Sequence, residues 1–326
     1  RLYRPLAQRF LHRTCRGAVL MIYEYALDPE MVATWGSQHN YRFFIRAFGI
    51  GQGRVASRFP KYWAKKVFDS FNDQNDNEKK RLVEILAHLK ENMVKRKDCI
   101  REDIDKSWLE NALLEHNRYP FQAILAKNNP ENHTQIICEE DVGSSSCNGW
   151  NISSGVIVKR NAADMAAAVE KMLSLCRWVK FIDPYIARGR DSFKESLNSF
   201  LKILANDRPV GTPEFVEIHT GNAAGDATTE YLRDRYFTSI IPSGMSITLF
   251  RWQEKPGGHR LHNRYILADI GGVAFLHGLD TGNDGETDDL NRLDYSQYHQ
   301  HCREYCKESK TFELTEEPLL ISGKRA

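Results

Sequence analysis

Residues 262–269 hold the side chains of this sequence that are best suited to chemistry. His262 and Arg264 are separated by one residue, and Asp269 follows five positions later. If residues 261–269 form a strand, His262 and Arg264 project from one face and Asp269 lies at the strand end. An imidazole can attack phosphorus, and a guanidinium can bind two non-bridging phosphate oxygens together. The segment therefore predicts a site that binds or cleaves a phosphodiester.

Each of these side chains also has a structural interpretation. His262 could be hydrogen-bonded within a hairpin instead of facing a ligand. Arg264 could form an internal ion pair with Asp269 or with Asp280. The phosphate site requires an imidazole and a guanidinium that face open space, so the surroundings of these two groups distinguish the interpretations.

The motif lies in a region, residues 151–326, in which predicted strands and helices alternate. The strands are expected at 178–182, 215–219, 246–252, 261–269 and 273–277, and the helices at 162–175, 193–204 and 228–241. Strands joined by helices indicate a layered α/β sheet, and Gly271-Gly272 is suited to a hairpin turn. We therefore expect an α/β domain with a mixed sheet flanked by helices.

This region resembles the phospholipase D superfamily, whose motif is a histidine, a lysine two positions later and an aspartate five positions after the lysine. Arg264 stands in place of the lysine. The resemblance is stronger to the C-terminal phospholipase D-like domain of MIT-domain-containing proteins and to uncharacterised bacterial proteins, and it covers about residues 155–310. It rests on three stretches: His262-Asn263-Arg264-Tyr265-Ile266, Gly271-Gly272 and Gly278-Leu279-Asp280.

The resemblance implies a need for a second histidine. Superfamily active sites use one histidine as nucleophile and another as acid, from two copies of the motif, whereas this chain has one copy. A homodimer or a substitute histidine would complete the pair. His219, at the end of a predicted strand, is the best substitute, ahead of His259 and His277.

The resemblance also implies roles for Asn283 and Asp183. Asn283 would help Arg264 to hold phosphoryl oxygens, although the usual Gly-Ser-x-Asn step is replaced here by residues 278–283, which lack the serine. Asp183 would lie at the mouth of the sheet, where strand ends gather polar residues. An Asp-Pro pair after a strand is also a common turn, so Asp183 has a structural alternative.

Two functions follow from the resemblance. The first is a metal-independent phosphodiesterase, most simply a nuclease acting on DNA or RNA, with a role in bacterial defence suggested by the bacterial relatives. The second is an inactive module that binds nucleic acid, a partner protein or, as a weaker expectation, anionic lipid. The MIT-associated relatives bind phospholipid without cleaving it.

Residues 21–150 are expected to form a mainly helical N-terminal domain. Apolar residues recur at helical spacing over residues 79–94, and Ser107 with Glu110 forms a capping box. No acid occurs between residues 31 and 68, where basic and aromatic residues alternate. Such a stretch is typical of a surface that binds nucleic acid, and equally of a helix pair with an aromatic core. A partner protein could also bind through the N-terminal domain. Its candidate ligand-binding residues are Arg42, Arg46, Arg54, Arg58, Lys61 and Lys65.

Composition sets the remaining expectations. The net charge of +2 and seven scattered cysteines favour a cytoplasmic protein without a disulfide framework.

We expect no cofactor and no metal: His299, Cys302 and Cys306 would share one helix face, whereas zinc takes four ligands, usually from separate elements. Residues 280–291 imitate a calcium loop, but Asn291 replaces its final glutamate. Residues 1–20 form a basic extension, either a targeting segment or sequence upstream of a start at Met21.

Overall fold

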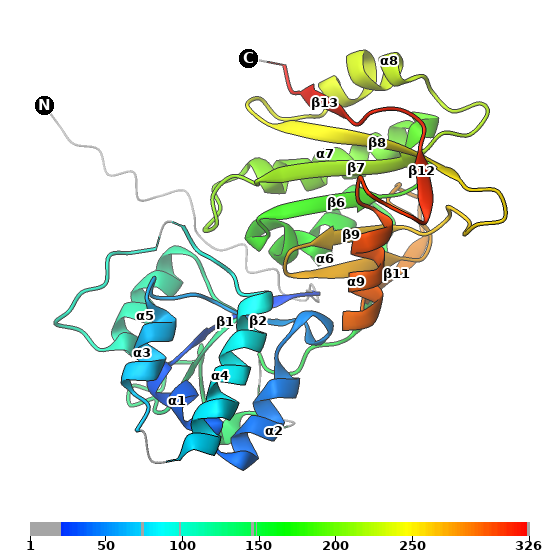
Figure 1. Ribbon diagram of the computed structural model, residues 1–326. Helices are drawn as coiled ribbons and strands as arrows, with labels where there is room; N and C mark the ends of the chain where they lie inside the picture. Colours follow the sequence, from blue (N-terminus) through cyan, green and yellow to red (C-terminus); the bar gives the residue numbers. More distant parts are fainter. Residues whose placement is uncertain (1–20, 73–74, 98, 145–146, 148, 325–326) are drawn as a thin grey trace, which may run out of the picture.

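The computed structural model describes residues 21–72, 75–97, 99–144, 147 and 149–324, and it shows two α/β units, each built on its own sheet (Figure 1). The basic extension at residues 1–20 lies outside the described residues. The α/β class expected from the sequence is confirmed, and Trp150 is buried in the core of the first unit, shortly before the second sheet begins at Gly155.

The N-terminal unit contains a parallel sheet that the sequence analysis missed. Its strands lie in the order β2 (Arg54–Ala56), β1 (Tyr23–Leu27), β3 (Ala123–Ala126) and β4 (Ile136–Cys138). The prediction of a mainly helical domain was therefore incomplete. These strands have three to five residues each, too few to display a strand period against their helical surroundings.

Helices surround this small sheet. They are α1 (Pro29–Ala33), α2 (Gln38–Ala47), α3 (Trp63–Asp69), α4 (Asp76–Glu91) and α5 (Trp108–Arg118). The capping box predicted at Ser107 is confirmed at the start of α5, and the periodic residues of α4 bury Leu82, Ile85, Leu86 and Leu89. A buried ion-pair triad stabilises the unit: Arg96 contacts Glu24 at 2.7 Å and Glu115 at 2.8 Å.

The larger sheet has the predicted mixed character. Its order is β12 (Phe312–Leu314), β8 (Ser246–Glu254), β7 (Phe215–Gly221), β6 (Trp178–Ile182), β9 (Tyr265–Ala268), β10 (Gly271–Phe275), β11 (Thr287–Arg292) and β5 (Gly155–Lys159), and β13 (Leu319–Ser322) also pairs with β8. Strands β6, β7 and β8 are parallel, and the other pairings are antiparallel.

Helices cover both faces of this sheet. α6 (Ala162–Leu175) and α7 (Asp191–Ala205) share a core with Phe181 and Ile218 on one face, and α9 (Tyr295–Glu304) lies against Tyr265 on the other (Figure 1). The helix predicted at 228–241 is broken into α8 (Thr229–Tyr231), a π-helical turn at Leu232–Tyr236 and a 3-10 turn at Phe237–Ser239. The sheet flanked by helices is otherwise as predicted.

The register of the central strands defines two edges of the large sheet. We call the edge where β6, β7 and β8 end the carboxyl edge, and the edge where they begin the opposite edge. Ile182 pairs with His219 on one side and with Tyr265 on the other. Strand β9 is antiparallel to β6, so it begins at the carboxyl edge and ends at the opposite edge.

Candidate functional site at the carboxyl edge

Arg264 and Asp183 lie side by side at the carboxyl edge. Each residue is one position beyond the paired residues Tyr265 and Ile182, so the strand register brings the two together. They come from segments about eighty residues apart in the chain, and the electrostatic influence of Arg264 lowers the pKa of Asp183. The structure therefore joins two of the residues that the sequence analysis placed at the mouth of the sheet.

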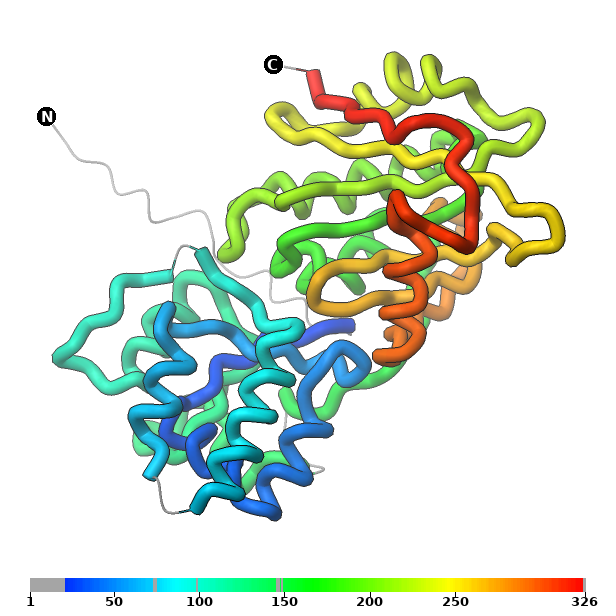
Figure 2. Tube along the Cα trace, in the orientation of Figure 1, coloured from blue at the N-terminus to red at the C-terminus, as the bar shows by residue number. Residues whose placement is uncertain are grey.

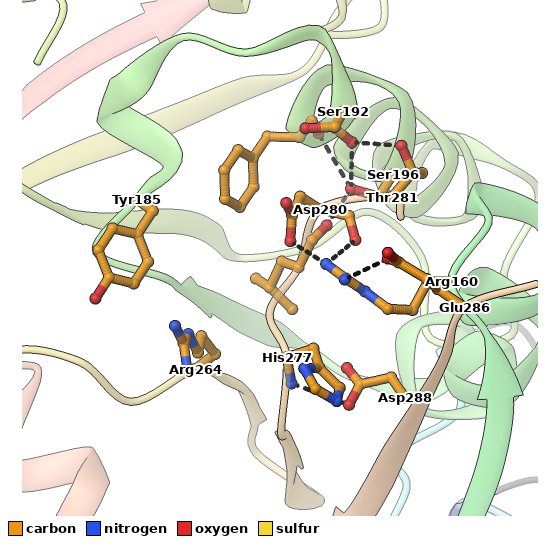
Figure 3. Close-up of polar contacts among 12 residues, drawn as sticks. Arg160, Tyr185, Ser192, Ser196, Arg264, His277, Asp280, Thr281, Glu286 and Asp288 are labelled. Atoms are coloured by element: carbon orange, nitrogen blue, oxygen red, sulfur yellow. Dashed lines mark hydrogen bonds and ion pairs between the residues drawn. The ribbon is translucent and has the colours of Figure 1, made fainter. Parts of the chain in front are cut away.

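Arg264 is a cation that neutral groups hold in place. Its Nη1 donates a hydrogen bond to the Leu276 carbonyl oxygen at 3.3 Å, and its guanidinium lies 5.1 Å from the ring centroid of Tyr185 (Figure 3). Arg188 lies against the same ring at 4.3 Å. Within the described part of the chain, Arg264 forms no ion pair and its buried Nε has no hydrogen-bond partner. The predicted pairs with Asp269 and Asp280 are therefore absent there, which leaves the guanidinium available to an anion.

Asp183 connects the end of β6 to the segment that follows β10. Its side chain is fully buried, Oδ1 accepts a hydrogen bond from the Tyr185 amide, and Oδ2 accepts one from the Leu279 amide, both at 2.9 Å. Burial raises the pKa of Asp183 to about 6, although these hydrogen bonds and Arg264 act in the other direction. A Cβ atom at Gly278 would lie 3.0 Å from Oδ2, so this close crossing requires glycine. Asp183 thus has the structural role that the sequence analysis gave as its alternative.

His262 lies in a loop and not in the predicted strand. Strand β9 begins at Tyr265, so the alternation argument that placed His262 and Arg264 on one strand face was wrong. The apolar run needed for a buried strand starts only at Tyr265, after a polar segment that contains Gly257 and Gly258. The His262 side chain is exposed, and its Nδ1 lies 3.2 Å from the Arg260 carbonyl oxygen. It is therefore accessible to a ligand.

Asp269 lies at the opposite edge, at the far end of β9 from Arg264. Its Oδ1 accepts a hydrogen bond from the Arg177 amide at 2.8 Å, and its Oδ2 pairs with Arg177 Nε at 2.9 Å. Arg177 also contacts Glu214. The catalytic role expected for Asp269 does not fit this position, because the length of β9 separates it from the carboxyl edge. Its contacts hold the start of β6.

His219 is enclosed in an aromatic stack under α9. It is 1% exposed, its ring stacks on Phe250 at 4.5 Å, and Trp252 Nε1 donates a hydrogen bond to its Nδ1 at 3.0 Å. Its Nε2 lies 3.0 Å from Glu217 Oε2. Burial lowers the pKa of His219 to about 4. Both ring nitrogens are engaged inside the protein, so this position does not suit the expected substitute acid.

Asn283 belongs to a loop that closes on itself. Its amide group and its backbone N–H both bond to Glu286, and Arg160 pairs with Glu286 at 3.0 Å and with Asp280 at 2.7 Å (Figure 3). These contacts use the Asn283 side chain to shape the turn. The structure therefore does not bring Asn283 to Arg264, and the stretch that imitated a calcium loop is partly strand β11.

The basic and aromatic stretch of the N-terminal unit is divided by the fold. Its aromatic residues Phe44, Phe48, Phe59 and Trp63 are buried. Arg54 donates two hydrogen bonds to the Trp150 carbonyl oxygen, and Arg58 is half-buried. Arg42 and Arg46 are exposed on α2, whereas Lys61 and Lys65 are exposed at α3, and α4 lies between these two helices (Figure 1). The core interpretation accounts for these four aromatic residues.

The sequence analysis overlooked a run of basic residues at the carboxyl edge. Residues 255–264, which we call the basic loop, join β8 to β9 and project from the sheet as the gold loop in Figure 2. The loop carries Lys255, His259, Arg260, His262 and Arg264, and no acid occurs from residue 255 to residue 268. Of these residues, His259, Arg260 and His262 are exposed. The absence of acids was the signal available in the sequence.

Two further features concern metals and membranes. Among the described residues, no group of three or more histidine, cysteine or acidic side chains is arranged to hold a metal ion. No helix in the described ranges has the length and apolar composition needed to cross a membrane.

Comparison of the chain with protein-family models, curated proteins and solved structures found no match.

Proposed function

We propose that residues 155–324 form a phospholipase D-like domain that binds the phosphate backbone of nucleic acid at its carboxyl edge, with Arg264 as the principal contact. The observation that supports this proposal is the basic loop, which contains no acid and exposes Arg260 together with two imidazoles. The loop ends at the guanidinium of Arg264, which forms no ion pair in the described part of the chain. A strand of phosphates is attracted to such a cluster, because binding releases its counterions.

The composition of the basic loop favours nucleic acid over a lipid surface. A segment that binds a membrane usually pairs its cations with Trp, Phe or Leu side chains that enter the acyl region. Residues 255–264 contain no aromatic residue, and their one leucine, Leu261, is partly buried. The attraction is therefore electrostatic, as expected for a phosphate backbone.

Binding without cleavage is the simpler form of the proposal, because His219 is enclosed and its pKa is lowered to about 4. Cleavage is a second candidate, favoured by the exposed imidazole of His262 two positions from Arg264. His262 would form a bond to phosphorus as the bond to the leaving oxygen breaks, and a second imidazole would protonate that oxygen. In this proposal a partner copy of the chain or another histidine supplies the second imidazole.

The test compares Arg264→Ala with Arg303→Ala, which removes the same charge from an exposed position on α9. We expect Arg264→Ala to weaken binding of a fluorescent oligothymidine about tenfold. We also expect the slope of the logarithm of the affinity against the logarithm of the salt concentration to fall by roughly one, as for a lost phosphate contact. Fluorescence anisotropy over a salt series measures both quantities. Equal binding by the two variants would contradict the proposal.

Incubation of wild type and His262→Ala with labelled DNA and RNA in EDTA tests cleavage, which must depend on His262.

A further inference from the structure

We propose that His277, held by Asp288, is a second ligand for the phosphate backbone bound at Arg264, and that the site therefore takes a strand with successive phosphates in preference to a single phosphate group. This inference rests on the proposed function. It concerns a histidine that the sequence analysis ranked below His219, and Asp288, which lies in the stretch 280–291 that imitates a calcium loop.

His277 belongs to the segment that Arg264 contacts. Arg264 bonds to the carbonyl oxygen of Leu276, and its Nε lies 3.9 Å from the position that a Cβ atom of Gly278 would take. The residues on both sides of His277 therefore lie against the guanidinium. Figure 3 shows Arg264 and the His277 imidazole on opposite sides of this segment, and the His277 side chain is exposed. An elongated anion can contact both groups by crossing the segment.

Asp288 holds His277 from the neighbouring strand. Asp288 is 1% exposed, and its Oδ1 accepts the backbone N–H of His277 at 3.0 Å. Its Oδ2 is buried and has no hydrogen-bond partner among the described atoms. The imidazole lies beside this carboxylate in Figure 3. A buried acceptor without a partner is costly, so a hydrogen bond from the imidazole to Oδ2 would both satisfy it and fix the ring.

The charged groups around His277 leave it able to act on an anion. Burial raises the pKa of Asp288, and the electrostatic influence of His277 lowers it. The other nearby acids, Asp280 and Glu286, both pair with Arg160, which reduces their repulsion of a phosphate (Figure 3). Imidazoles gain a proton within the range of about pH 5 to 8, so a phosphate contact of this kind strengthens as the pH falls.

The position of the two groups indicates the class of ligand. Arg264 and His277 stand on either side of Leu276 and Gly278, and one small anion that binds the guanidinium has no need of the imidazole. A nucleic-acid strand presents one phosphate after another and can use both groups. His277 therefore contributes to binding of a strand and not to binding of free phosphate.

The experiment measures binding of a fluorescent oligothymidine at about pH 6 and about pH 8, where imidazole charge differs most, and its competition by inorganic phosphate. The variants are His277→Ala, Arg264→Ala and, as a matched control, His39→Ala, which removes an exposed histidine from α2. We expect His277→Ala to weaken oligothymidine binding several-fold at the lower pH, with little change at the higher pH. The affinity for inorganic phosphate should stay as in wild type.

Different results separate the two proposals. If Arg264→Ala weakens binding and His277→Ala behaves as His39→Ala, the inference about His277 is wrong and the phosphate site stands. If Arg264→Ala has no effect, the proposed function itself is wrong. Asp288→Asn retains an acceptor for the His277 amide, and we expect it to reduce the pH dependence. Wild-type pH dependence in Asp288→Asn would overturn the role of Asp288, and thermal unfolding of each variant verifies the fold.

Discussion

The two edges of the large sheet carry similar charged residues in different states of pairing. At the opposite edge, Arg177 contacts both Asp269 and Glu214. At the carboxyl edge, Arg264 contacts a carbonyl oxygen and an aromatic ring, and the acid beside it, Asp183, bonds to backbone amides instead. An arginine with paired acids stabilises the strand connections, whereas an arginine held by neutral groups keeps its charge for a ligand.

The same contrast applies to the histidines. His219 bonds through both ring nitrogens within the core, and burial depresses its pKa to about 4. His262 and His277 are exposed at the carboxyl edge. Residue type alone therefore does not decide the role of a histidine, because burial and pairing with neighbours decide whether its imidazole is free to act.

The largest effect that tests this comparison concerns the unpaired acid of the carboxyl edge. Burial raises the pKa of Asp183 to about 6, so the folded chain binds this proton more tightly than the unfolded chain does. The resulting stabilisation is complete below the unfolded pKa of about 4 and is lost as the pH rises through about 6, and its size is about 3 kcal/mol.

Asp183→Asn carries no titratable group, so we expect its free energy of unfolding to lack this loss between about pH 4 and about pH 7. Urea unfolding at several pH values measures the slope. Asp284→Asn, which changes an exposed carboxylate in the loop that follows β10, is the control and should keep the wild-type slope. Identical slopes in wild type and Asp183→Asn would show that folding does not raise the pKa of Asp183.

A smaller effect is expected at the opposite edge. Asp269→Ala removes both the ion pair with Arg177 Nε and the hydrogen bond from the Arg177 amide, and we expect a loss of about 2 kcal/mol in the free energy of unfolding. Oligothymidine binding should be unchanged, because Asp269 is far from the basic loop. Chemical unfolding and anisotropy on the same preparation check the two expectations. If Asp269→Ala weakened oligothymidine binding without loss of stability, the residues that bind nucleic acid would lie at the opposite edge and not at the carboxyl edge.

The smallest effect concerns Glu286, an acid in the loop between β10 and β11. Glu286 pairs with Arg160, and its side chain is 43% exposed, so we expect Glu286→Gln to leave the free energy of unfolding close to that of wild type. Removing its negative charge should strengthen oligothymidine binding about twofold at low salt, and the gain should vanish at high salt. Glu91→Gln, at the end of α4 in the N-terminal unit, serves as the charge-matched control. A gain of equal size in both variants would indicate a general charge effect.

Much of the larger unit could be predicted from residue patterns. Strand β6 matches the predicted range 178–182, and α6 matches 162–175, because each has an apolar pattern of clear period and a distinct end. The small sheet was not predictable in the same way. Its strand β1 buries Glu24, which is stable there only because Arg96, from a segment about seventy residues later, pairs with it.

The candidate site divides along the same line. The sequence by itself determined which chemical groups are available: a guanidinium at Arg264, imidazoles at His262 and His277, and a loop without acids. Only the tertiary structure decided that Asp269 pairs with Arg177, that His219 is enclosed, and that Asp183 bonds to the Leu279 amide. The physical reason is that burial and pairing depend on strand register between distant segments, which local spacing does not encode.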